Sequence, residues 1–532
     1  MRAPAAFAPL VHKPFRLFWI AQLVASLGTW MQNTAAGWLM TDLSATPTMV
    51  ALVQTAALLP VFVLAPLAGA LADMVDNRRL LVGNSVFLLL AAALLALLTW
   101  LDLTSAWGLV GLTFAFGIGT AMIGPSWQAL VVDLVPRSAL AGAIALNGIA
   151  FNGSRAVGPA LAGIVVGVIG TAACFGANAA SYLVVVAVLM MLPRAREPMP
   201  SGGLAVALRD GFRFARASVA LKTVLARDLG YFAAAAPVFA LLPLVARESL
   251  GAGPEGYGLL LAGMGVGAVT AGFLMPSFRM KASPDRLLML ATIGTTVALA
   301  GLAIAPNVPA GMAATFIFGF TWLIGNAQLQ FVLQTSLPTW VRARAISFHQ
   351  MALNGALAGA GLLWGLAGEF LGVRATLAAG AAVALATVIL GRLSPLRAAP
   401  QAEAEMAPAA AAGTAQPPDA AMLMAGTIGA VFVTSAWVVP IANRLKFMTL
   451  MEEVGRQRRA AGAFTWTLAE DISAPEHWIE AWGAESFDDH GRIIARTTLA
   501  LATLLDQAGA LAEGPPLSRV WVAPEGRKRI EA

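Results

Sequence analysis

The chain has 532 residues, of which 58% are hydrophobic and 12% are charged, with a formal net charge of +6. Soluble domains carry about 25% charged residues, so this composition and a mean hydropathy of +0.76 exclude a set of soluble globules and indicate a membrane protein. The Lys and Arg residues lie in short clusters between apolar stretches, which speaks against nucleic acid as a partner. The single Cys174 excludes an internal disulfide framework, and with four His residues we expect neither a metal site nor a cofactor.

Twelve apolar runs have the length of about 20 residues that a spanning helix needs. The first six lie at 15–40, 48–72, 79–101, 106–130, 142–168 and 171–192. After a polar, Arg-rich central loop at 193–222, six more lie at 224–246, 255–277, 286–306, 309–333, 345–370 and 373–393. The first run is too long for a signal peptide, so we expect a retained span. The predicted fold is an all-α polytopic membrane protein of twelve transmembrane helices in two six-helix halves, residues 1–192 and 223–393.

The short loops between these runs alternate in charge. Basic residues gather in every second loop, among them Arg78, Arg79, Arg137, Arg279, Lys281, Arg342 and Arg344, whereas the other loops carry only Arg247 and Arg374. The positive-inside rule therefore predicts that both termini and the central loop are cytoplasmic. The Ala and Arg content is typical of a bacterial source, so we expect a multi-pass protein of the bacterial inner (plasma) membrane, with the lipid bilayer as a partner.

The two halves resemble each other when they are shifted by 207 residues. Arg137 then meets Arg344, the segment 146–148 meets 353–355 (Leu-Asn-Gly in both), and Gly158 meets Gly365. Two equivalent six-helix halves indicate a carrier that moves one half against the other around a central site.

The last part of the chain has a different character. Residues 394–427 form an Ala/Pro-rich linker. Beyond it we predict a strand at 428–439, a helix at 440–461, strands at 464–471 and 477–485, a helix at 486–512 and a strand at 518–523. The order βαββαβ predicts a small soluble, cytoplasmic α+β domain of ferredoxin-like type over 428–532.

The loop between the second and third runs contains Gly69-Ala-Leu71-Ala72-Asp73, followed by Arg78-Arg79. It resembles the loop signature of the major facilitator superfamily, and departs from that signature at Met74, Asp76 and Asn77. The resemblance implies a conformational latch formed by Gly69, Asp73, Arg78 and Arg79. An acidic side chain there can pair with cations or with the positive end of a helix and so favour one of two states. The alternative is an ordinary solvated turn with basic residues.

The fifth run contains Arg155-Ala-Val-Gly158-Pro159-Ala-Leu-Ala-Gly163. It resembles the Gly-Pro motif of exporting branches of the same superfamily, with Ala162 in place of one glycine. Gly158, Pro159 and Gly163 are expected to bend the helix and allow close packing, and the resemblance implies outward transport. Simple packing of small residues is the alternative.

Polar residues in the same run define a candidate transport path. Asn152 and Arg155 are three residues apart and share a helix face, with Asn147 upstream. A charge at membrane depth usually faces a cavity or a partner. Either Arg155 lines the path, or the helix starts later and Arg155 reaches the membrane interface. Further candidates for the path are Trp30, Gln32, Gln128, Asn326, Gln330 and Asn354.

The stretch 136–163, together with Phe15-Arg16-Leu-Phe18-Trp19 and Gly28-Thr29-Trp30-Met31-Gln32, resembles the enterobactin-exporter-like branch of the superfamily. This resemblance, over about residues 12–395, implies proton antiport and siderophore-like or drug-like substrates. No acidic residue falls clearly within a span, and Asp228 is expected near the inner face, so the residues themselves do not indicate a proton carrier.

Residues 428–532 resemble dimeric α/β-barrel modules related to antibiotic-biosynthesis monooxygenases, on Gly462-Ala463-Phe464-Thr-Trp466, Glu470-Asp471, Glu480, Glu485-Ser486, His490 and Arg492. The resemblance implies dimerisation through this domain. No nucleotide loop, metal-ligand spacing or nucleophile triad is present in the sequence, and His490 is expected on a helix surface.

The sequence thus predicts a secondary active transporter, not an enzyme, that exports small amphipathic molecules by alternating access with a proton or another coupling ion. Two alternatives stay open. One is an importer of the same fold. The other is a membrane-anchored enzyme whose C-terminal domain is catalytic.

Overall fold

The computed structural model describes residues 9–44, 46–136, 139–192, 214–216, 218–337, 339–393, 395–396 and 429–523. Most of the predicted central loop and linker therefore lies outside the described residues. The chain divides into two compact units. The first comprises Met1–Ser201, Leu225–Gln330 and Ser347–Pro395, and the second comprises Gly202–Val224, Phe331–Ile346 and Leu396–Ala532.

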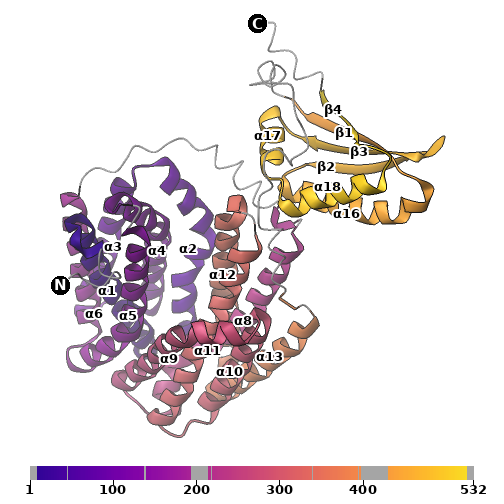
Figure 1. The fold of residues 1–532 in the computed structure, drawn as a ribbon. Coiled ribbons are helices and arrows are strands. Elements are labelled where there is room, and N and C mark those ends of the chain that lie inside the picture. The colour runs from indigo at the N-terminus through magenta and orange to yellow at the C-terminus, as the bar shows by residue number, and fades with distance from the viewer. Residues whose placement is uncertain are drawn as a thin grey trace. The chain divides into compact units, whose positions relative to one another are not determined.

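Among the described residues before residue 394, twelve long helices follow one another, and each has at least 21 residues (Figure 1). The helices of the first half are α1 (Lys13–Leu43), α2 (Pro47–Met74), α3 (Asn77–Trp100), α4 (Ala106–Leu134), α5 (Leu140–Val168) and α6 (Thr171–Met191). Those of the second half are α8 (Val219–Leu244), α9 (Pro254–Lys281), α10 (Pro284–Ile304), α11 (Val308–Ser336), α12 (Thr339–Leu371) and α13 (Val373–Leu393). A short π-helix, η3 (Val245–Ser249), continues α8. Figure 1 shows the two sets as two neighbouring groups of helices.

Eleven helices among the described residues are long and apolar enough to cross a membrane. They coincide with the second to twelfth predicted runs. The remaining predicted span corresponds to α1, a 31-residue helix that is more polar because it contains Gln22, Gln32 and Asn33. The all-α polytopic fold with a small C-terminal sheet domain is thus confirmed.

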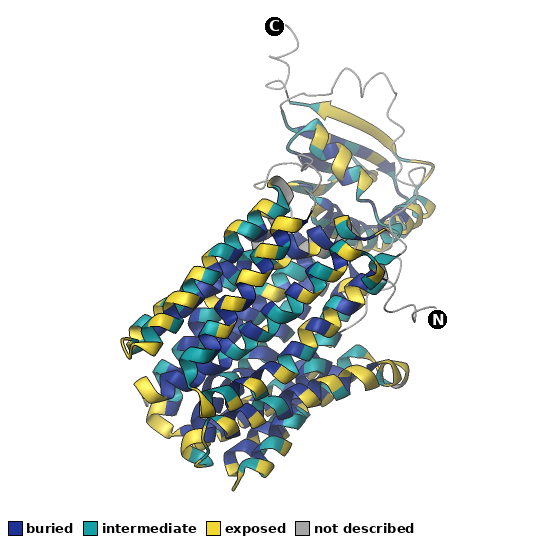
Figure 2. Ribbon diagram, turned by 90° about the vertical axis from the view of Figure 1, so that its left-hand side faces the viewer, coloured by how far each residue is buried: buried dark blue, intermediate teal, exposed yellow. Residues whose placement is uncertain are grey.

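The outer faces of the long helices are exposed, as the yellow segments in Figure 2 show, and many of the exposed residues are large and apolar. Leu90, Phe273, Phe370 and Ile389 each expose more than 60% of their surface. Exposed apolar surface on this scale would be unstable in water, and it is what contact with lipid requires. The many hydrophobic residues therefore lie both in the contacts between helices and on the outer faces that would contact lipid.

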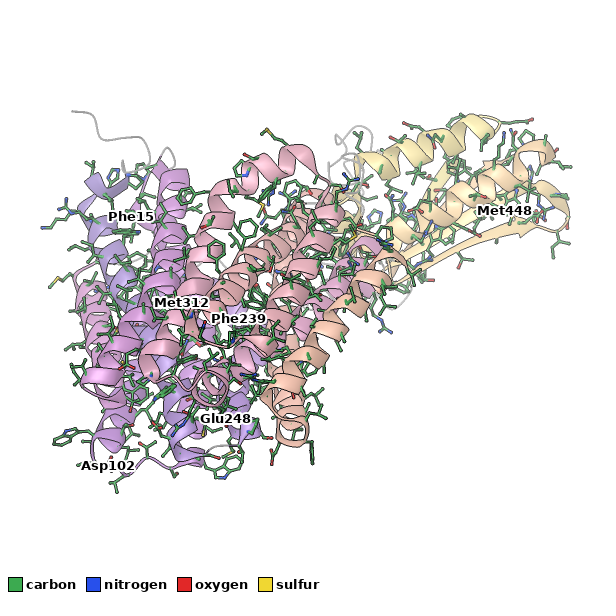
Figure 3. All side chains as sticks on the ribbon, turned by 90° about the horizontal axis from the view of Figure 1, so that it is seen from below. Phe15, Asp102, Phe239, Glu248, Met312 and Met448 are labelled. Carbon is green, nitrogen blue, oxygen red and sulfur yellow. The ribbon has the colours of Figure 1, made fainter. Side chains whose placement is uncertain are left out.

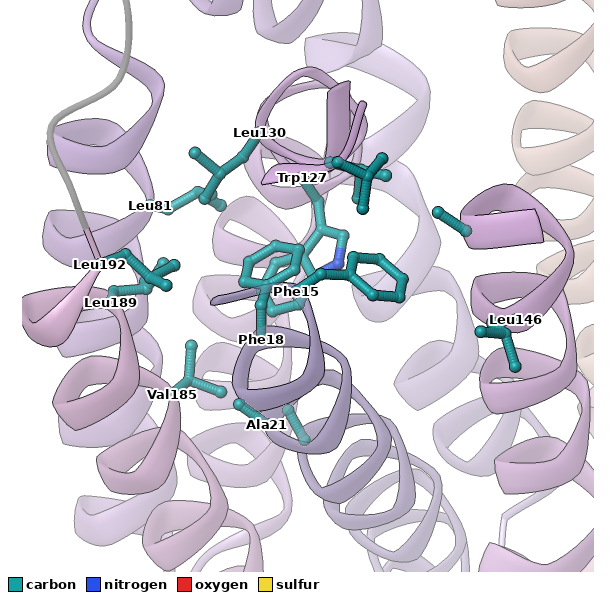
Figure 4. Close-up of a cluster of buried hydrophobic side chains, with 14 residues drawn as sticks. Phe15, Phe18, Ala21, Leu81, Trp127, Leu130, Leu146, Val185, Leu189 and Leu192 are labelled. Atoms are coloured by element: carbon teal, nitrogen blue, oxygen red, sulfur yellow. The ribbon is translucent and has the colours of Figure 1, made fainter. Parts of the chain in front are cut away.

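A cluster of buried side chains joins five helices of the first half (Figure 4). Phe15 and Phe18 of α1 lie at its centre, and the Phe18 ring stacks on that of Trp127 from α4 at 4.2 Å between centroids. Leu81, Leu146 and Leu189 bring in α3, α5 and α6. The cluster is contiguous and free of charge, so it holds this half together as one body.

The second unit contains a four-stranded antiparallel sheet of order β2-β3-β1-β4. Its elements are β1 (Val431–Val438), α16 (Arg444–Ala461), β2 (Thr465–Asp471), β3 (Ala474–Ala484), α17 (Phe487–Ala495), α18 (Leu499–Leu511) and β4 (Leu517–Val522), with a 3-10 turn, η5 (Ile441–Asn443), before α16. The predicted order βαββαβ agrees with these elements, except that the helix predicted at 486–512 is two helices. Ser486 and Thr498 each cap a separate N-terminus, which explains the break.

The two faces of this sheet differ. Alternate residues of β1, such as Val431 and Val433, are buried in the core clusters that involve the helices. On the other face Phe432 of β1 pairs with Trp521 of β4, and both are exposed. Dimerisation through residues 428–532 stays a prediction.

Candidate functional site

The two helical halves contact each other at one end of the bundle, here termed the Asp42 end. Arg247 forms an ion pair with Asp42 and donates a hydrogen bond to Thr41 Oγ1 at 2.9 Å. On α12, Glu369 accepts a hydrogen bond from Thr48 of α2. Figure 3 shows Asp102 and Glu248, from opposite halves, at this same end, and Phe15 at the opposite end. Polar contacts therefore join the two halves at this end in the conformation described.

The predicted Gly-Pro motif forms the contact between α5 and α9. A Cβ atom at Gly163 would lie 2.9 Å from the carbonyl oxygen of Pro254, and one at Gly258 would lie 3.0 Å from that of Pro159. Helix α5 continues through Pro159. Glycine at 163 and 258 is required because the two backbones approach without room for side chains. The motif thus packs one half on the other.

A related contact joins α2 and α12. A Cβ atom at Gly365 would lie 2.5 Å from that of Ala51, and Thr55 Oγ1 donates to the carbonyl oxygen of Ala358 at 2.9 Å. Gly365 is the residue that the 207-residue shift aligns with Gly158. A Cβ atom at Gly158 would lie 2.7 Å from the Cβ of Trp30. The repeated glycines therefore both mark close contacts of helices.

Arg155 lies between two aromatic side chains from the two halves. Its guanidinium carbon is 5.6 Å from the ring centroid of Trp30 on α1 and 5.9 Å from that of Trp322 on α11. These are cation–π distances. Arg155 comes 15 residues after the start of α5 and 13 before its end, so it lies near the middle of the helix. Among the described residues it has no carboxylate partner.

The other predicted path residues lie in different surroundings. Gln32 is buried, and its Oε1 accepts a hydrogen bond from Asn178 Nδ2 at 2.8 Å, which joins α1 to α6. Asn152 and Asn354 donate to carbonyl oxygens one turn earlier in their own helices, those of Gly148 and Gln350. Of the remaining four, Asn147 and Gln330 are half-buried, Gln128 is exposed, and Asn326 contacts His349. The structure thus brings Arg155 and Trp30 together and joins them to Trp322, and gives Gln32 a packing role.

A buried polar cluster in the second half contains the predicted path residue Asn326, but its other two members were not predicted as a site. Asp228 of α8 and His349 of α12 are both fully buried, and Oδ2 of Asp228 lies 2.9 Å from Nδ1 of His349. The other imidazole nitrogen, Nε2, lies 3.2 Å from Oδ1 of Asn326 on α11. Asp228, which was expected near the inner face, lies nine residues after the start of α8. The signal that could have found the cluster is a histidine in an apolar span.

Of the four predicted latch residues, Arg78 and Arg79 have described side chains, whereas the side chains of residues 69 and 73 lie outside the described part of the structure. Asp76 caps α3 by accepting the backbone N–H of Arg78 at 2.9 Å. The Arg78 side chain donates to the carbonyl oxygens of Leu189 at 2.7 Å and Met190 at 2.8 Å, at the C-terminus of α6. Arg79 is 79% exposed. Arg78 thus joins α3 to α6, whereas Arg79 is exposed.

The C-terminal sheet domain contains a second buried polar cluster. Arg458 of α16 lies 3.7 Å from the Glu480 carboxylate of β3, which also accepts a hydrogen bond from Trp466 Nε1 at 3.0 Å. His490 was expected on a helix surface, but it is 2% exposed and its ring stacks on that of Trp482 at 5.4 Å. Burial, and secondly the charge of Arg458, lowers the pKa of His490. The prediction for His490 was wrong because its position on α17 turns it toward the sheet.

Comparison with known sequences identifies the family to which the chain belongs. The chain matches the family described as transmembrane secretion effectors over residues 4–525. It is 26% identical over 375 residues to the uncharacterized MFS-type transporter YfiS of Bacillus subtilis (strain 168), covering 66% of this chain and 86% of that protein.

Two relatives have names that state a substrate. Identity is 29% over 238 residues with the enterobactin exporter EntS of Salmonella choleraesuis (strain SC-B67), covering 44% of this chain and 56% of EntS. It is also 29% over 180 residues with the staphyloferrin A transporter of Staphylococcus aureus (strain NCTC 8325 / PS 47), covering 34% and 45%. The chain thus spans about half the length of these two relatives.

Solved structures of transporters share the fold. A bacterial homolog of the human lysosomal transporter Spinster, in an inward-facing conformation, has a TM-score of 0.56 at 13% identity, covering 74% of this chain and 96% of its own. The nucleoside transporter NupG has a TM-score of 0.60 at 10% identity, covering 72% and 98%. With the family match over almost the whole length, the protein belongs to the transmembrane secretion effector family of major facilitator superfamily transporters and is a multi-pass membrane protein.

Proposed function

We propose that this protein exports small, anionic amphipathic molecules across the bacterial inner membrane by alternating access, in exchange for protons. The observation that carries the proposal is Arg155 between Trp30 and Trp322, which lie on different halves. A site shared by the two halves is what a carrier needs, because the movement of one half against the other then changes the site itself.

The chemistry of Arg155 supports an anionic group on the substrate. A guanidinium at membrane depth is costly, and such residues usually face a cavity or a partner. Since no carboxylate pairs with Arg155 among the described residues, a carboxylate, phenolate or sulfonate of a substrate would supply the missing charge. The rings of Trp30 and Trp322 would contact the apolar part of the same molecule.

The relatives and the Gly-Pro motif support the direction and the substrate class. Proteins related to this chain are named as an exporter of enterobactin and a transporter of staphyloferrin A, so siderophore-like molecules are candidates, beside drug-like ones. The basic loops support an orientation with the Arg79 end in the cytoplasm. Closure at the Asp42 end then corresponds to a conformation closed toward the outside.

Direction and coupling can be tested with the purified chain in liposomes. The probe is sulforhodamine B, an anionic aromatic dye, compared with the cationic dye rhodamine 6G. We expect sulforhodamine B to accumulate when the lumen is acidic, since antiport exchanges lumenal protons for dye. Accumulation only with an acidic exterior would indicate proton symport and would favour the importer. Equal handling of both dyes would contradict the proposed preference for anions.

The role of Arg155 can be tested with substitutions in the same assay. Arg155→Gln removes the charge and should abolish uptake of the anionic dye, while Arg155→Lys keeps the charge and should retain part of it. Arg392→Gln, at an exposed arginine in the last turn of α13, is the matched control. Wild-type uptake by Arg155→Gln, at equal protein content, would remove Arg155 from the transport path.

A further inference from the structure

Three helices of the second half bring the Asp228–His349–Asn326 cluster together. Asp228 and His349 expose none of their surface and lie 2.9 Å apart, with Asn326 at 3.2 Å on the far side of the imidazole. Buried ionisable groups inside membrane helices are costly and usually functional. The arrangement therefore calls for a role beyond packing.

The hydrogen bonds determine how many protons the cluster holds. Oδ1 of Asn326 can only accept, so the hydrogen bond to it puts a proton on Nε2 of His349. Nδ1 then faces Oδ2 of Asp228, and a hydrogen bond between these atoms needs one further proton. Whether this proton sits on the carboxyl or on the imidazole, Asp228 and His349 together have no net charge. This arrangement of atoms therefore accommodates one exchangeable proton between Asp228 and His349.

Burial favours the form that holds this proton. The second oxygen of Asp228, Oδ1, is buried without a hydrogen-bond partner among the described residues. Loss of the shared proton would leave a net negative charge there, opposite a bare imidazole nitrogen, and an unpaired buried charge is strongly unfavourable. Release therefore requires a rearrangement, in which the Asn326 amide turns or water gains access.

Apart from His349, the described charged groups on neighbouring helices form no ion pair with Asp228. On α9, Arg279 donates a hydrogen bond to the carbonyl oxygen of Ala327 at 3.3 Å. On α8 itself, Arg227 pairs with Asp285 of α10 at 3.2 Å. On α13, Arg392 is exposed. Helix α11 contributes Asn326 and Trp322, which are uncharged. Among the described residues, the ion-pair partner of Asp228 is His349 of α12. The proton balance of the cluster is thus set by Asp228 and His349.

Aromatic contacts join the cluster to the proposed substrate site. The ring of Phe232, one turn after Asp228 on α8, lies 6.0 Å from that of His349 and 5.1 Å from that of Trp322. Trp322 in turn contacts Arg155, and it is four residues before Asn326 on α11, so both share one helix face. A movement of Trp322 with substrate would therefore move Asn326.

We propose that Asp228 and His349, oriented by Asn326, form the proton-carrying site of the transporter. This assignment rests on the proposed proton exchange. In each cycle the hydrogen bond between Oδ2 and Nδ1 opens, one proton leaves to water, and the pair becomes singly negative. A proton from the opposite side of the membrane later restores the neutral pair. Asn326 acts as a positioning residue that keeps the second proton on Nε2.

The proton sharing can be tested without transport. The chain has four histidines, His12, His349, His477 and His490, so ¹⁵N-histidine spectra of the full-length protein are simple, and His349→Gln identifies its signal. We expect Asp228→Asn to shift the His349 signal and its pH dependence, while Asp133→Asn, at an exposed acidic residue of α4, leaves both unchanged. A His349 signal that is identical in wild-type and Asp228→Asn protein would overturn the proposal.

Transport then tests the coupling. Asp228→Asn and His349→Gln should lose the accumulation of sulforhodamine B driven by an acidic lumen, down to the level of protein-free liposomes. Both should keep the exchange of dye between equal pH values, which needs no net proton movement. Acid-driven accumulation at the wild-type rate in either variant would overturn the assignment. Absence of dye movement by wild-type protein would instead contradict the proposed function, and the spectra would still decide the proton site.

Discussion

At the scale of single residues, similar side chains in one motif have different environments. Arg78 and Arg79 are adjacent in the loop signature, yet the first donates to the end of α6 and the second is exposed. The residue types predicted a cationic loop, but not which arginine reaches another helix. That depends on the end of α6, more than 100 residues further along the chain.

We expect Arg78→Ala to lower the free energy of unfolding of the protein in detergent by about 1–2 kcal/mol, because two carbonyl oxygens of α6 lose charged donors. Arg79→Ala should change it by much less, since its contact with Asp76 is exposed. Thermal or denaturant unfolding of the two variants checks this. Equal destabilisation would show that the motif acts through charge alone.

A second prediction concerns pH and His490. Because burial and Arg458 lower the pKa of His490 in the folded domain, the unfolded chain binds one more proton as the pH falls through the ordinary histidine value near 6.5. Stability of the domain should therefore fall below that pH. Hydrogen exchange of residues 429–523 measures it. His490→Phe should flatten this dependence, whereas His477→Asn, at an exposed position, should keep it.

At the scale of helices, the Gly-Pro motif is explained by a contact rather than by a bend alone. Its sequence indicated close packing, and the structure shows that the partner is α9 of the other half, at Pro254 and Gly258. Small residues in a helix predict that another helix packs closely against it. Which helix does so is decided by how the two halves meet.

Gly163→Ala should push α5 and α9 apart, because the added carbon would lie 2.9 Å from the carbonyl oxygen of Pro254. Such overpacking costs about 1–3 kcal/mol, and this cost falls on the conformation that is closed at the Asp42 end. That conformation should therefore lose most of its population. Electron spin distances between labels at the exposed Leu103 and Leu371 measure the opening. Gly153→Ala is the control, since nothing lies within 4 Å of its added carbon. Equal distances in both variants would contradict the prediction.

At the scale of the whole molecule, the ion pair between Asp42 and Arg247 joins the two halves, but both side chains are more than 40% exposed. An exposed pair contributes about 0.2–1 kcal/mol, so Arg247→Gln should shift the same spin distances less than Gly163→Ala does. The exchanged pair, Asp42→Arg with Arg247→Asp, should restore the wild-type distribution. A full opening by Arg247→Gln would show that charge, rather than packing, closes this end.

The sequence by itself determined the elements. Apolar runs of membrane length and the period of the C-terminal strands and helices are local properties, so twelve long helices and the order βαββαβ could be predicted from composition and spacing. It also indicated Arg155, because a charge in an apolar run is conspicuous, and it offered Trp30 as a further candidate for the path. The tertiary structure decided the partners. Asp228 and His349 are 121 residues apart along the chain, and only the packing of α8 against α12 makes them one site. Contacts between distant segments depend on how whole helix faces fit together, and no local pattern contains that information.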